Sequence, residues 1–398
     1  MRLTFNDTET AFAYKTEKEL NNGKFLFNTM NYPWFAAVGV RLTPFLMKTG
    51  LPINGLIRST IFKQFVGGET LDETTAVAKR LGKYNVDVIL DYGVEGKEGE
   101  ENFDAAKDEF IRAVNYAATQ PNIPFLSVKL TGLARFVLMQ TLNSAPRLRS
   151  GVHDYEEETE EWNRVRKRLY EICKAAAEKG VSILIDAEES WIQDPVDRLT
   201  IEMMMEFNKT KAVVYNTIQL YRHDRLDFLK LSHRIARQKD FILGVKLVRG
   251  AYMEKERARA EECGYPSPIQ QDKSFADGDF NVAVDYCMQN VNTIAFILAS
   301  HNEFSNLHAA QLMDEKGIPH NHPHIHFSQL YGMSDNITFN LAAAGYRASK
   351  YLPFGPIRDV IPYLMRRAQE NSSLNGQTNR ELLLIRSELK RREKLKKK

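Results

Sequence analysis

Eight short apolar runs alternate with longer helical patterns through most of this chain of 398 residues. The runs occupy residues 86–95, 124–133, 181–190, 213–221, 241–252, 293–300, 324–333 and 346–355. Strands that alternate with helices form a parallel sheet, and eight such units match a (βα)8 barrel in number and length. An open doubly wound sheet is the main alternative. That fold usually carries a GxGxxG string after its first strand, and the chain has none. We therefore predict an α/β fold, a (βα)8 barrel.

The segments before and after the alternating region have a different sequence pattern. Residues 1–85 carry helical patterns punctuated by glycines, and we expect them to form a helical extension or cap. Residues 86–373 would then form the barrel. Residues 374–398 continue the helical spacing and end in KLKKK, so they predict a basic helical tail.

The composition excludes several classes of protein. A net charge of +3 gives no electrostatic reason to expect nucleic-acid binding. The 3 cysteines lie far apart, which argues against a disulfide framework and fits a reducing compartment. The first residues resemble neither a signal peptide nor a transit peptide, and no apolar run is long enough to span a membrane. We expect a cytoplasmic location.

Polar and charged residues end the predicted strands, where a barrel places its active site. They are Asp91, Lys129, Asp186 with Glu188 and Glu189, Gln219, Lys246 with Arg249, His301 with Asn302, Gln329 and Tyr351. Charges buried at such a mouth must be paired or must bind a charged ligand. Several cations beside a few carboxylates suit an anionic ligand with several hydroxyl groups.

Metal binding is the alternative at the same strand ends. Asp186, Glu188 and His301 could supply oxygen and nitrogen ligands. Five cationic side chains expected in the same region would repel a divalent ion, however: Lys129, Lys246, Arg249, Arg366 and Arg367. The alternating histidines of residues 320–326 include Pro323, and we interpret this tract as a loop that leads into a strand. We expect no metal.

The stretch YLPFGPIRDVIPYLMRRAQENSS, residues 351–373, predicts a strand, a turn and a helix. On the helix, Tyr363, Arg366, Arg367 and Glu370 form a polar stripe next to an apolar one. The stripe has two interpretations: a solvated face with ion pairs, or a pair of arginines that holds a small carboxylate.

Several motifs together resemble the proline dehydrogenase family. They are KLTG at 129–132, IDAEES at 185–190, KLVRGAYMEKERARAEECGYPSPIQ at 246–270, ASHN at 299–302, QLYGMSDN at 329–336 and the 351–373 stretch. The sequences of these motifs are closer to those of the monofunctional, mitochondrial-type enzymes than to those of the bifunctional bacterial ones. The resemblance implies a distorted (βα)8 barrel that binds FAD. It also implies oxidation of L-proline to Δ1-pyrroline-5-carboxylate by hydride transfer from C5 to flavin N5, with a membrane quinone as the electron acceptor.

The resemblance also implies roles for individual residues. Arg366, Arg367 and Lys129 would hold the substrate carboxylate. Tyr351 would pack against the proline ring, while Tyr363 and Leu330 would line the same pocket. The expected FAD-binding residues are Asp186, Gln219, Lys246, Val248, Arg249, Gly250, Ala251, Tyr252, Lys273, His301, Asn302 and Glu370. Family members that prefer hydroxyproline carry a smaller residue at the position of Tyr351, so this tyrosine favours proline.

Three further expectations concern partners and alternatives. The quinone acceptor and the basic tail together suggest peripheral contact with the inner face of a bacterial membrane. A metal-dependent barrel lyase or aldolase and a hydroxyproline-preferring paralogue are the enzyme alternatives. A non-catalytic barrel that binds an amino acid would be expected to lack Lys129, Arg366 or Arg367, and all three are present.

Overall fold

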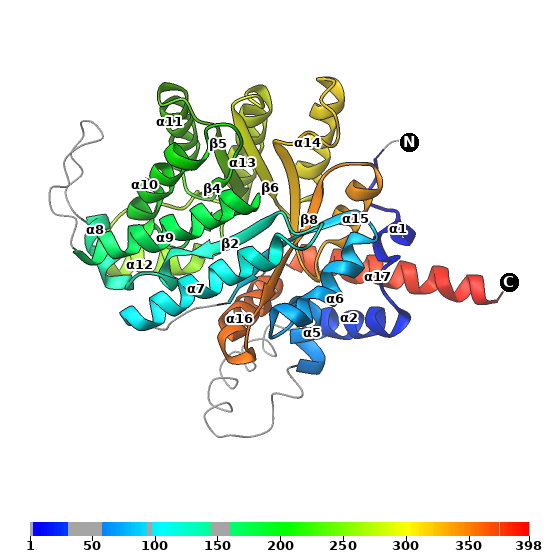
Figure 1. Ribbon diagram of the computed structural model, residues 1–398. Helices are drawn as coiled ribbons and strands as arrows, with labels where there is room; N and C mark the ends of the chain where they lie inside the picture. The colour runs from blue at the N-terminus through cyan, green and yellow to red at the C-terminus, as the bar shows by residue number, and fades with distance from the viewer. Residues whose placement is uncertain (1–2, 31–57, 94–97, 145–159, 374, 398) are drawn as a thin grey trace. The chain divides into compact units, whose positions relative to one another are not determined.

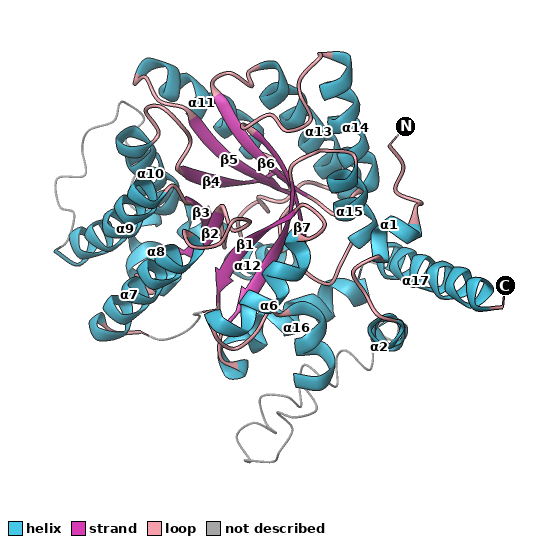
Figure 2. Ribbon diagram, turned by 45° about the vertical axis from the view of Figure 1, so that its right-hand side comes forward, coloured by secondary structure: helices cyan, strands magenta, loops and turns pink. Residues whose placement is uncertain are grey.

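A closed barrel of eight parallel strands forms the framework of the protein, in the order β1 to β8. The computed structural model describes residues 3–30, 58–93, 98–144, 160–373 and 375–397. The strands are β1 (Val86–Tyr92), β2 (Phe125–Lys129), β3 (Ser182–Asp186), β4 (Val214–Gln219), β5 (Leu243–Val248), β6 (Ile294–Ala299), β7 (Ile325–Leu330) and β8 (Ala348–Phe354) (Figures 1 and 2). Each lies inside one of the eight predicted runs, so the (βα)8 prediction is confirmed.

Helices follow the strands and also occur at both ends of the chain. Before the barrel come α1 (Thr8–Phe12), α2 (Glu17–Met30), the π-helical turn η1 (Arg58–Phe62), α5 (Lys63–Phe65) and α6 (Leu71–Gly82). Within the alternating region are α7 (Glu100–Ala117), the 3-10 turn η2 (Leu130–Gly132), α8 (Phe136–Ser144), α9 (Glu160–Lys179), α10 (Ser190–Phe207), α11 (Arg225–Gln238), α12 (Met253–Cys263), α13 (Lys273–Gln289), α14 (Glu303–Glu315), α15 (Asp335–Ala343) and α16 (Ile357–Ser373). The last helix is α17 (Asn375–Lys396).

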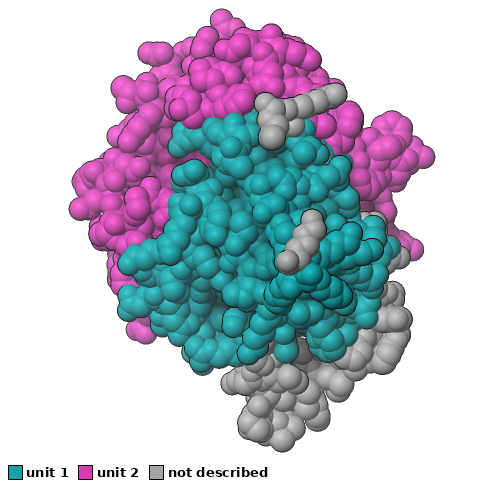
Figure 3. Space-filling model, turned by 90° about the vertical axis from the view of Figure 1, so that its right-hand side faces the viewer, with its two compact units in different colours: residues 1–95, 301–303, 327–398 teal, residues 96–300, 304–326 magenta. Residues whose placement is uncertain are grey.

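The chain divides into two compact units, which Figure 3 shows in different colours. Unit 1 contains residues 1–95, 301–303 and 327–398. Unit 2 contains residues 96–300 and 304–326. Both ends of the chain therefore belong to unit 1.

In unit 1, β8 pairs with β1 on one side and with β7 on the other. The β1 pairing runs from Val86 beside Ala348 to Tyr92 beside Phe354. The helical N-terminus, α16 and α17 share one apolar core that includes Phe12, Phe27, Tyr363 and Ile385. Figure 1 shows α2 and α17 lying side by side within this unit.

In unit 2, β2 to β6 are buried strands with helices packed against them. Phe103 and Phe110 of α7, for example, are 1% exposed, and they lie on one face of that helix. Asp272 caps α13 by accepting hydrogen bonds from the backbone N–H groups of Ser274 and Phe275. Local sequence signals and hydrophobic periodicity thus agree on the position of these elements.

The predicted N-terminal and C-terminal extensions pack together in unit 1. The described part of the first 85 residues contains the helices α1, α2, η1, α5 and α6, and residues 31–57 of the predicted helical extension lie outside the described residues. Leu382, Leu384 and Ile385 of α17 are buried in the shared core. The C-terminal segment is therefore a packed helix with a basic end. The domain boundaries at residues 85 and 373 stay predictions.

Candidate active site

The predicted site residues are divided between the two units, and we describe each set within its own unit. Unit 2 holds Lys129, Asp186, Gln219, Lys246, Val248, Arg249, Gly250, Ala251, Tyr252 and Lys273. Unit 1 holds His301, Asn302, Leu330, Tyr351, Tyr363, Arg366, Arg367 and Glu370.

Two lysines converge on the carboxylate of Asp186 at the end of β3. Asp186 lies beside Lys129 in the register of β2 and β3, and the Lys129 Nζ is 3.7 Å from its Oδ2. Lys246 on β5 donates a hydrogen bond to Oδ1 of the same carboxylate. Asp186 is 9% exposed and Lys246 is 5% exposed, so this is a largely desolvated group of charges. The Asp186 carboxylate is thus paired with two lysines, as a buried charge requires.

Gln219 at the end of β4 offers a hydrogen-bond acceptor. Its Nε2 donates to the backbone carbonyl of Glu188 at 2.8 Å, which fixes the orientation of the amide. Its Oε1 is buried and accepts no hydrogen bond from the described residues. Buried polar atoms are normally paired, so this oxygen is suited to a donor from a bound molecule.

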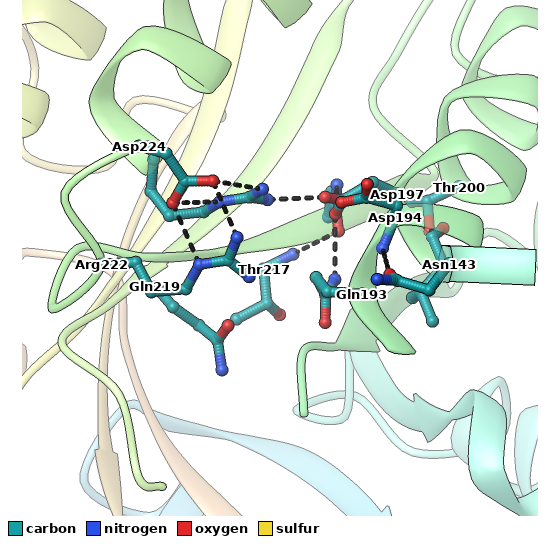
Figure 4. A network of polar contacts seen from close by, with 12 residues as sticks. Asn143, Gln193, Asp194, Asp197, Thr200, Thr217, Gln219, Arg222 and Asp224 are labelled. Carbon is teal, nitrogen blue, oxygen red and sulfur yellow. Dashed lines mark hydrogen bonds and ion pairs between the residues drawn. The ribbon is translucent and has the colours of Figure 1, made fainter. Parts of the chain in front are cut away.

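A polar network around Asp197 of α10 holds the segment after β3 in place (Figure 4). Asp197 accepts hydrogen bonds from Arg225 Nη1 at 2.6 Å, Asn216 Nδ2 at 2.9 Å and Gln193 Nε2 at 2.9 Å. Gln193 in turn accepts the backbone N–H of Glu188 at 3.1 Å. This chain of contacts ties the Glu188 loop to β4, α10 and α11.

The guanidinium of Arg249, which follows β5, is bound by protein groups. It donates to Asp277 Oδ1 at 2.5 Å, Ser300 Oγ at 2.6 Å and Ser305 Oγ at 3.0 Å. It also lies 4.3 Å from the ring centroid of Phe280. Burial lowers the pKa of Arg249, with the hydrogen bond to Asp277 acting in the opposite direction.

Asp277 of α13 joins two of the predicted residues, and sequence reasoning missed it. Besides Arg249, it binds the largely exposed Lys273 at 2.5 Å. Burial by itself would raise the pKa of Asp277, but the hydrogen bonds from Lys273 and Arg249 outweigh it and the pKa is lowered. The signal available in the sequence was the i,i+4 spacing of Lys273 and Asp277.

Gly250 has a backbone conformation that favours glycine, with φ of +147°. A Cβ atom at this position would lie 2.3 Å from Cδ1 of Tyr221. The neighbouring predicted residues take different places: Val248 ends β5, and Tyr252 directly precedes α12. Ala251, between Gly250 and Tyr252, is exposed.

Four of the predicted substrate residues lie close together in unit 1. Leu330 and Tyr351 are neighbours in the register of β7 and β8. Leu330 and Tyr363 both pack in the unit 1 core, and the Cζ of Arg367 lies 5.4 Å from the ring centroid of Tyr363. Arg367 is 8% exposed, and Arg366 next to it is half-buried.

The predicted polar stripe on α16 needs one correction. Tyr363 is 8% exposed and packs among apolar side chains such as Ile361 and Leu364, so it belongs to the buried face. Helical spacing alone could not distinguish an aromatic ring on the polar face from one at the edge of the core. Glu370 lies on the same helix, but its side chain is outside the described residues.

His301 follows β6 and contacts the start of α15. Its Nδ1 is 2.9 Å from Oγ of Ser334, the N-cap residue of that helix. Both His301 and Asn302 are half-buried.

A buried ion cluster in unit 1 was also missed by sequence reasoning. Lys350 of β8 is 0% exposed, and its Nζ is 2.9 Å from Oδ1 of Asp335. Lys15 binds Oδ2 of Asp335 at 2.8 Å, and the Tyr14 hydroxyl donates to the same atom at 2.9 Å. The two lysines lower the pKa of Asp335 to about 2 against the opposing effect of burial. The available sequence signal for this cluster was Lys350, a lysine in the middle of the apolar run at 346–355.

Two features of the structure bear on the alternatives. Among the described residues, no three His, Cys, Asp or Glu side chains form a group that could hold a metal ion. Within the same part of the chain, no helix is both long and apolar enough to cross a membrane.

Comparison with known proteins agrees with the motifs and the barrel. The family model described as "Proline dehydrogenase" matches residues 74–380. The chain is 30% identical to "Proline dehydrogenase 1, mitochondrial" of Dictyostelium discoideum, over 97% of this chain and 74% of that protein. It is 32% identical to the hydroxyproline dehydrogenase of Xenopus laevis, over 98% of this chain and 90% of the other.

A solved structure also has the same fold. The crystal structure of proline utilization A (PutA) from Bdellovibrio bacteriovorus matches with a TM-score of 0.71 and 24% identity. The match covers 81% of this chain and 34% of the PutA chain, so this chain spans about a third of PutA. The barrel and the family match define the class of protein as a (βα)8-barrel oxidoreductase. The chain belongs to the proline dehydrogenase family.

Proposed function

We propose that this chain catalyses the FAD-dependent oxidation of L-proline to Δ1-pyrroline-5-carboxylate, the first step of proline catabolism. The observation that carries the proposal is the family match over residues 74–380, a range that contains every residue proposed for the site. The close arrangement of Leu330, Tyr351, Tyr363 and Arg367 in unit 1 supports it.

Arg366 and Arg367 are proposed to bind the carboxylate of proline, and Lys129 to add a third positive charge. A guanidinium is planar and matches a carboxylate with two parallel hydrogen bonds. Arg367 is held against the Tyr363 ring, which limits its conformational freedom before substrate binds. Fixed donors of this kind place the substrate without an entropic cost at the moment of reaction.

Tyr351 is proposed to pack against the ring of proline and to select it over hydroxyproline. Tyr351 is half-buried, and its ring leaves less room for an added hydroxyl group than a smaller residue would. Because a hydroxyproline dehydrogenase is among the relatives, the comparison needs a direct test. We expect kcat/KM for L-proline to exceed that for trans-4-hydroxy-L-proline, and Tyr351→Ser to reduce the difference.

The residues of unit 2 fit a flavin cofactor. The unpaired Gln219 Oε1 can accept a hydrogen bond, and the Asp186–Lys246 pair can bind hydroxyl groups. Gly250 gives the segment after β5 its positive φ, and the space that a Cβ atom would need there is filled by the Tyr221 ring. The proposed FAD-binding residues are Asp186, Gln219, Lys246, Val248, Arg249, Gly250, Ala251, Tyr252, Lys273, His301, Asn302 and Glu370. FAD, when bound, supplies the acceptor for the hydride that leaves C5 of proline.

The chain's own residues then bind and orient the substrate. The carboxylate-binding cations fix one end of proline, and Leu330, Tyr351 and Tyr363 exclude water from its ring. Arg249 and Lys246 place positive charge near the cofactor. We propose that this charge stabilises the electron-rich reduced form.

An absorbance spectrum tests cofactor and substrate together. We expect the purified protein to show flavin bands that bleach when L-proline is added without oxygen. Protein without flavin absorbance that also takes up no added FAD would overturn the proposal and favour the metal-dependent lyase or aldolase. Flavin bands that stay unchanged with L-proline would overturn the substrate assignment.

A membrane quinone is proposed as the electron acceptor, with peripheral contact through the basic end of α17. Several cations of this helix are already paired: Arg391 and Arg392 bind Glu388, and Lys396 binds Glu17. Lys397, directly after the helix, binds Glu393. Lys390 and Lys394 are exposed and have no ion pair with any described residue. They are the cations that we propose to meet anionic lipid.

A further inference from the structure

Two consecutive residues of α17 bind groups next to His301. Arg380 binds the segment that follows His301, and Glu381 binds the residue that contacts its ring. Arg380 Nε donates to Glu303 Oε1 at 2.8 Å, two residues after His301. Glu381 Oε1 accepts the backbone N–H of Ser334 at 2.5 Å. Ser334 Oγ lies 2.9 Å from His301 Nδ1. All of these residues belong to unit 1.

Ser334 has an unusual backbone conformation at the point where it meets both partners. Its φ of 50° and ψ of 44° lie in the left-handed region, which residues other than glycine rarely adopt. Such a residue keeps this conformation only when its surroundings hold it. Glu381 binds the backbone N–H of this same residue, and the two residues are 4% and 3% exposed.

The position of the Ser334 hydroxyl depends on that backbone. In the left-handed conformation the side chain of Ser334 is directed so that its Oγ meets Nδ1 of His301. A contact to one ring nitrogen fixes the rotation of an imidazole. The direction of the other nitrogen, Nε2, is then fixed as well.

We propose that Glu381 is a positioning residue, which acts through Ser334 to set the orientation of the His301 imidazole for contact with the flavin. This inference rests on the proposed function, because His301 is one of the proposed FAD-binding residues. Helix α17 would then contribute to the site, although it is neither a barrel strand nor a loop that follows one.

The test compares four variants of the full-length protein. Glu381→Leu removes the acceptor, and Glu381→Gln keeps an acceptor oxygen of the same length. Ser334→Ala removes the hydroxyl group and leaves the backbone N–H in place. Glu388→Gln is the matched control, because Glu388 is a buried carboxylate on the same helix that binds Arg391 and Arg392.

The first measurement is the NMR spectrum of ¹⁵N-histidine-labelled protein, with the His301 signals assigned from a His301→Gln variant. Glu381→Leu and Ser334→Ala should each shift the signals of the His301 ring nitrogens. Glu381→Gln and the Glu388 control should leave them close to the wild-type values. Unchanged His301 signals in a folded Glu381→Leu variant would overturn the proposal.

The second measurement is the Kd for FAD, obtained by removing and rebinding the flavin and following its fluorescence. Glu381→Leu and Ser334→Ala should each weaken binding on the order of tenfold, the size typical of groups that orient a ligand-binding histidine. The double variant should be no weaker than either single variant, because both act on the same imidazole. Additive losses would show that Glu381 does not act through Ser334.

The two readouts separate the two proposals. If the wild-type protein does not bind FAD, the proposed function fails, and the NMR measurement still decides whether Glu381 positions His301. If Glu381→Leu does not fold, Ser334→Ala and Glu381→Gln decide the matter. The serine variant must then shift the His301 signals and the glutamine variant must not, and the reverse result would overturn the proposal.

Discussion

The two neighbouring arginines of α16 differ in their surroundings although they are adjacent in sequence. Arg367 is nearly buried beside the Tyr363 ring, whereas Arg366 is only half-buried. A half-buried guanidinium keeps donors for a ligand while a buried one is more strongly fixed by its packing. We therefore expect both to be needed for substrate binding, with the larger loss of stability on replacing Arg367.

Replacement of Arg366 by alanine should weaken proline binding. The lost interaction is a charge-assisted hydrogen bond worth roughly 1.5–3 kcal/mol, so KM for L-proline should rise by about 10- to 150-fold. Steady-state kinetics on Arg366→Ala measure this. Arg358→Ala is the control, since Arg358 lies on the same helix with a side chain that is 71% exposed. A normal KM in the Arg366 variant would show that this residue does not bind the carboxylate.

At the scale of elements, α10 is held to the barrel by one carboxylate with three donors. Asp197 is 3% exposed and pairs with Arg225, which is also 3% exposed. A buried charge that loses its partner is costly because water cannot replace the lost contact. The Asp197 network therefore stabilises the Glu188 loop as well as the helix.

Asp197→Asn should lower the free energy of unfolding by about 3 kcal/mol, as expected when one partner of a buried pair is removed. Urea unfolding measures the change. Glu202→Gln on the same helix is the control, because Glu202 pairs with Arg166 near the surface and its side chain is 41% exposed. The free energy of unfolding of the Glu202→Gln variant should fall by less than about 1 kcal/mol. Equal losses in the two variants would contradict the structural role of the Asp197 network.

The strands were predictable from the sequence because each is a short apolar run followed by polar residues. The same signal located Lys129, Asp186, Gln219 and Lys246 at strand ends. It could not locate Glu381, because the sequence around it reads as a basic helix and its burial depends on packing against distant parts of unit 1. Likewise, the pairing of Lys350 with Asp335 and Lys15 joins segments far apart in sequence, which periodicity does not reveal.

At the scale of the whole molecule, buried carboxylates of α17 make stability depend on pH. Burial and the nearby Asp335 raise the pKa of Glu381 to about 7, while Ser334, Lys350 and Lys15 act in the opposite direction. In the unfolded chain Glu381 loses its proton near its ordinary pKa of 4.5. Between these two pKa values Glu381 keeps its proton in the folded protein and loses it in the unfolded chain. The stability contributed by Glu381 therefore falls as pH rises from 4.5 to about 7.

Glu381→Gln should gain stability relative to the wild type as the pH is raised from about 5 to about 8, because glutamine cannot ionise. Urea unfolding at the two pH values measures the gain. Glu388→Gln should show no such gain. Burial raises the pKa of Glu388, but hydrogen bonds from Arg391 and Arg392 outweigh burial and lower it. The stability it contributes is therefore fully present above its ordinary pKa. Parallel pH profiles for wild type and Glu381→Gln would contradict the prediction.

The proposed membrane contact makes a prediction about the exposed cations of α17. Lys390→Glu combined with Lys394→Glu should reduce binding to vesicles that contain phosphatidylglycerol, since each lysine near an anionic surface contributes about 1 kcal/mol. Sedimentation with the vesicles measures binding. Lys230→Glu combined with Arg234→Glu, on α11, gives a control with the same change in net charge. Equal binding by the wild-type protein and the α17 variant would show that these lysines of α17 do not contact the membrane.

The discontinuity of unit 1 has a consequence for synthesis on the ribosome. Its first helices carry Phe12, Leu20 and Phe27, whose core partners on α17 are made only after β8. Strand β1 must also wait for β8, whereas nearly all of unit 2 lies on one stretch of chain between them. Unit 2 can therefore begin to fold while the N-terminal segment is still without its packing partners. Until α17 leaves the ribosome, the apolar face of α1 and α2 lacks these packing partners, and we expect a chaperone to bind it.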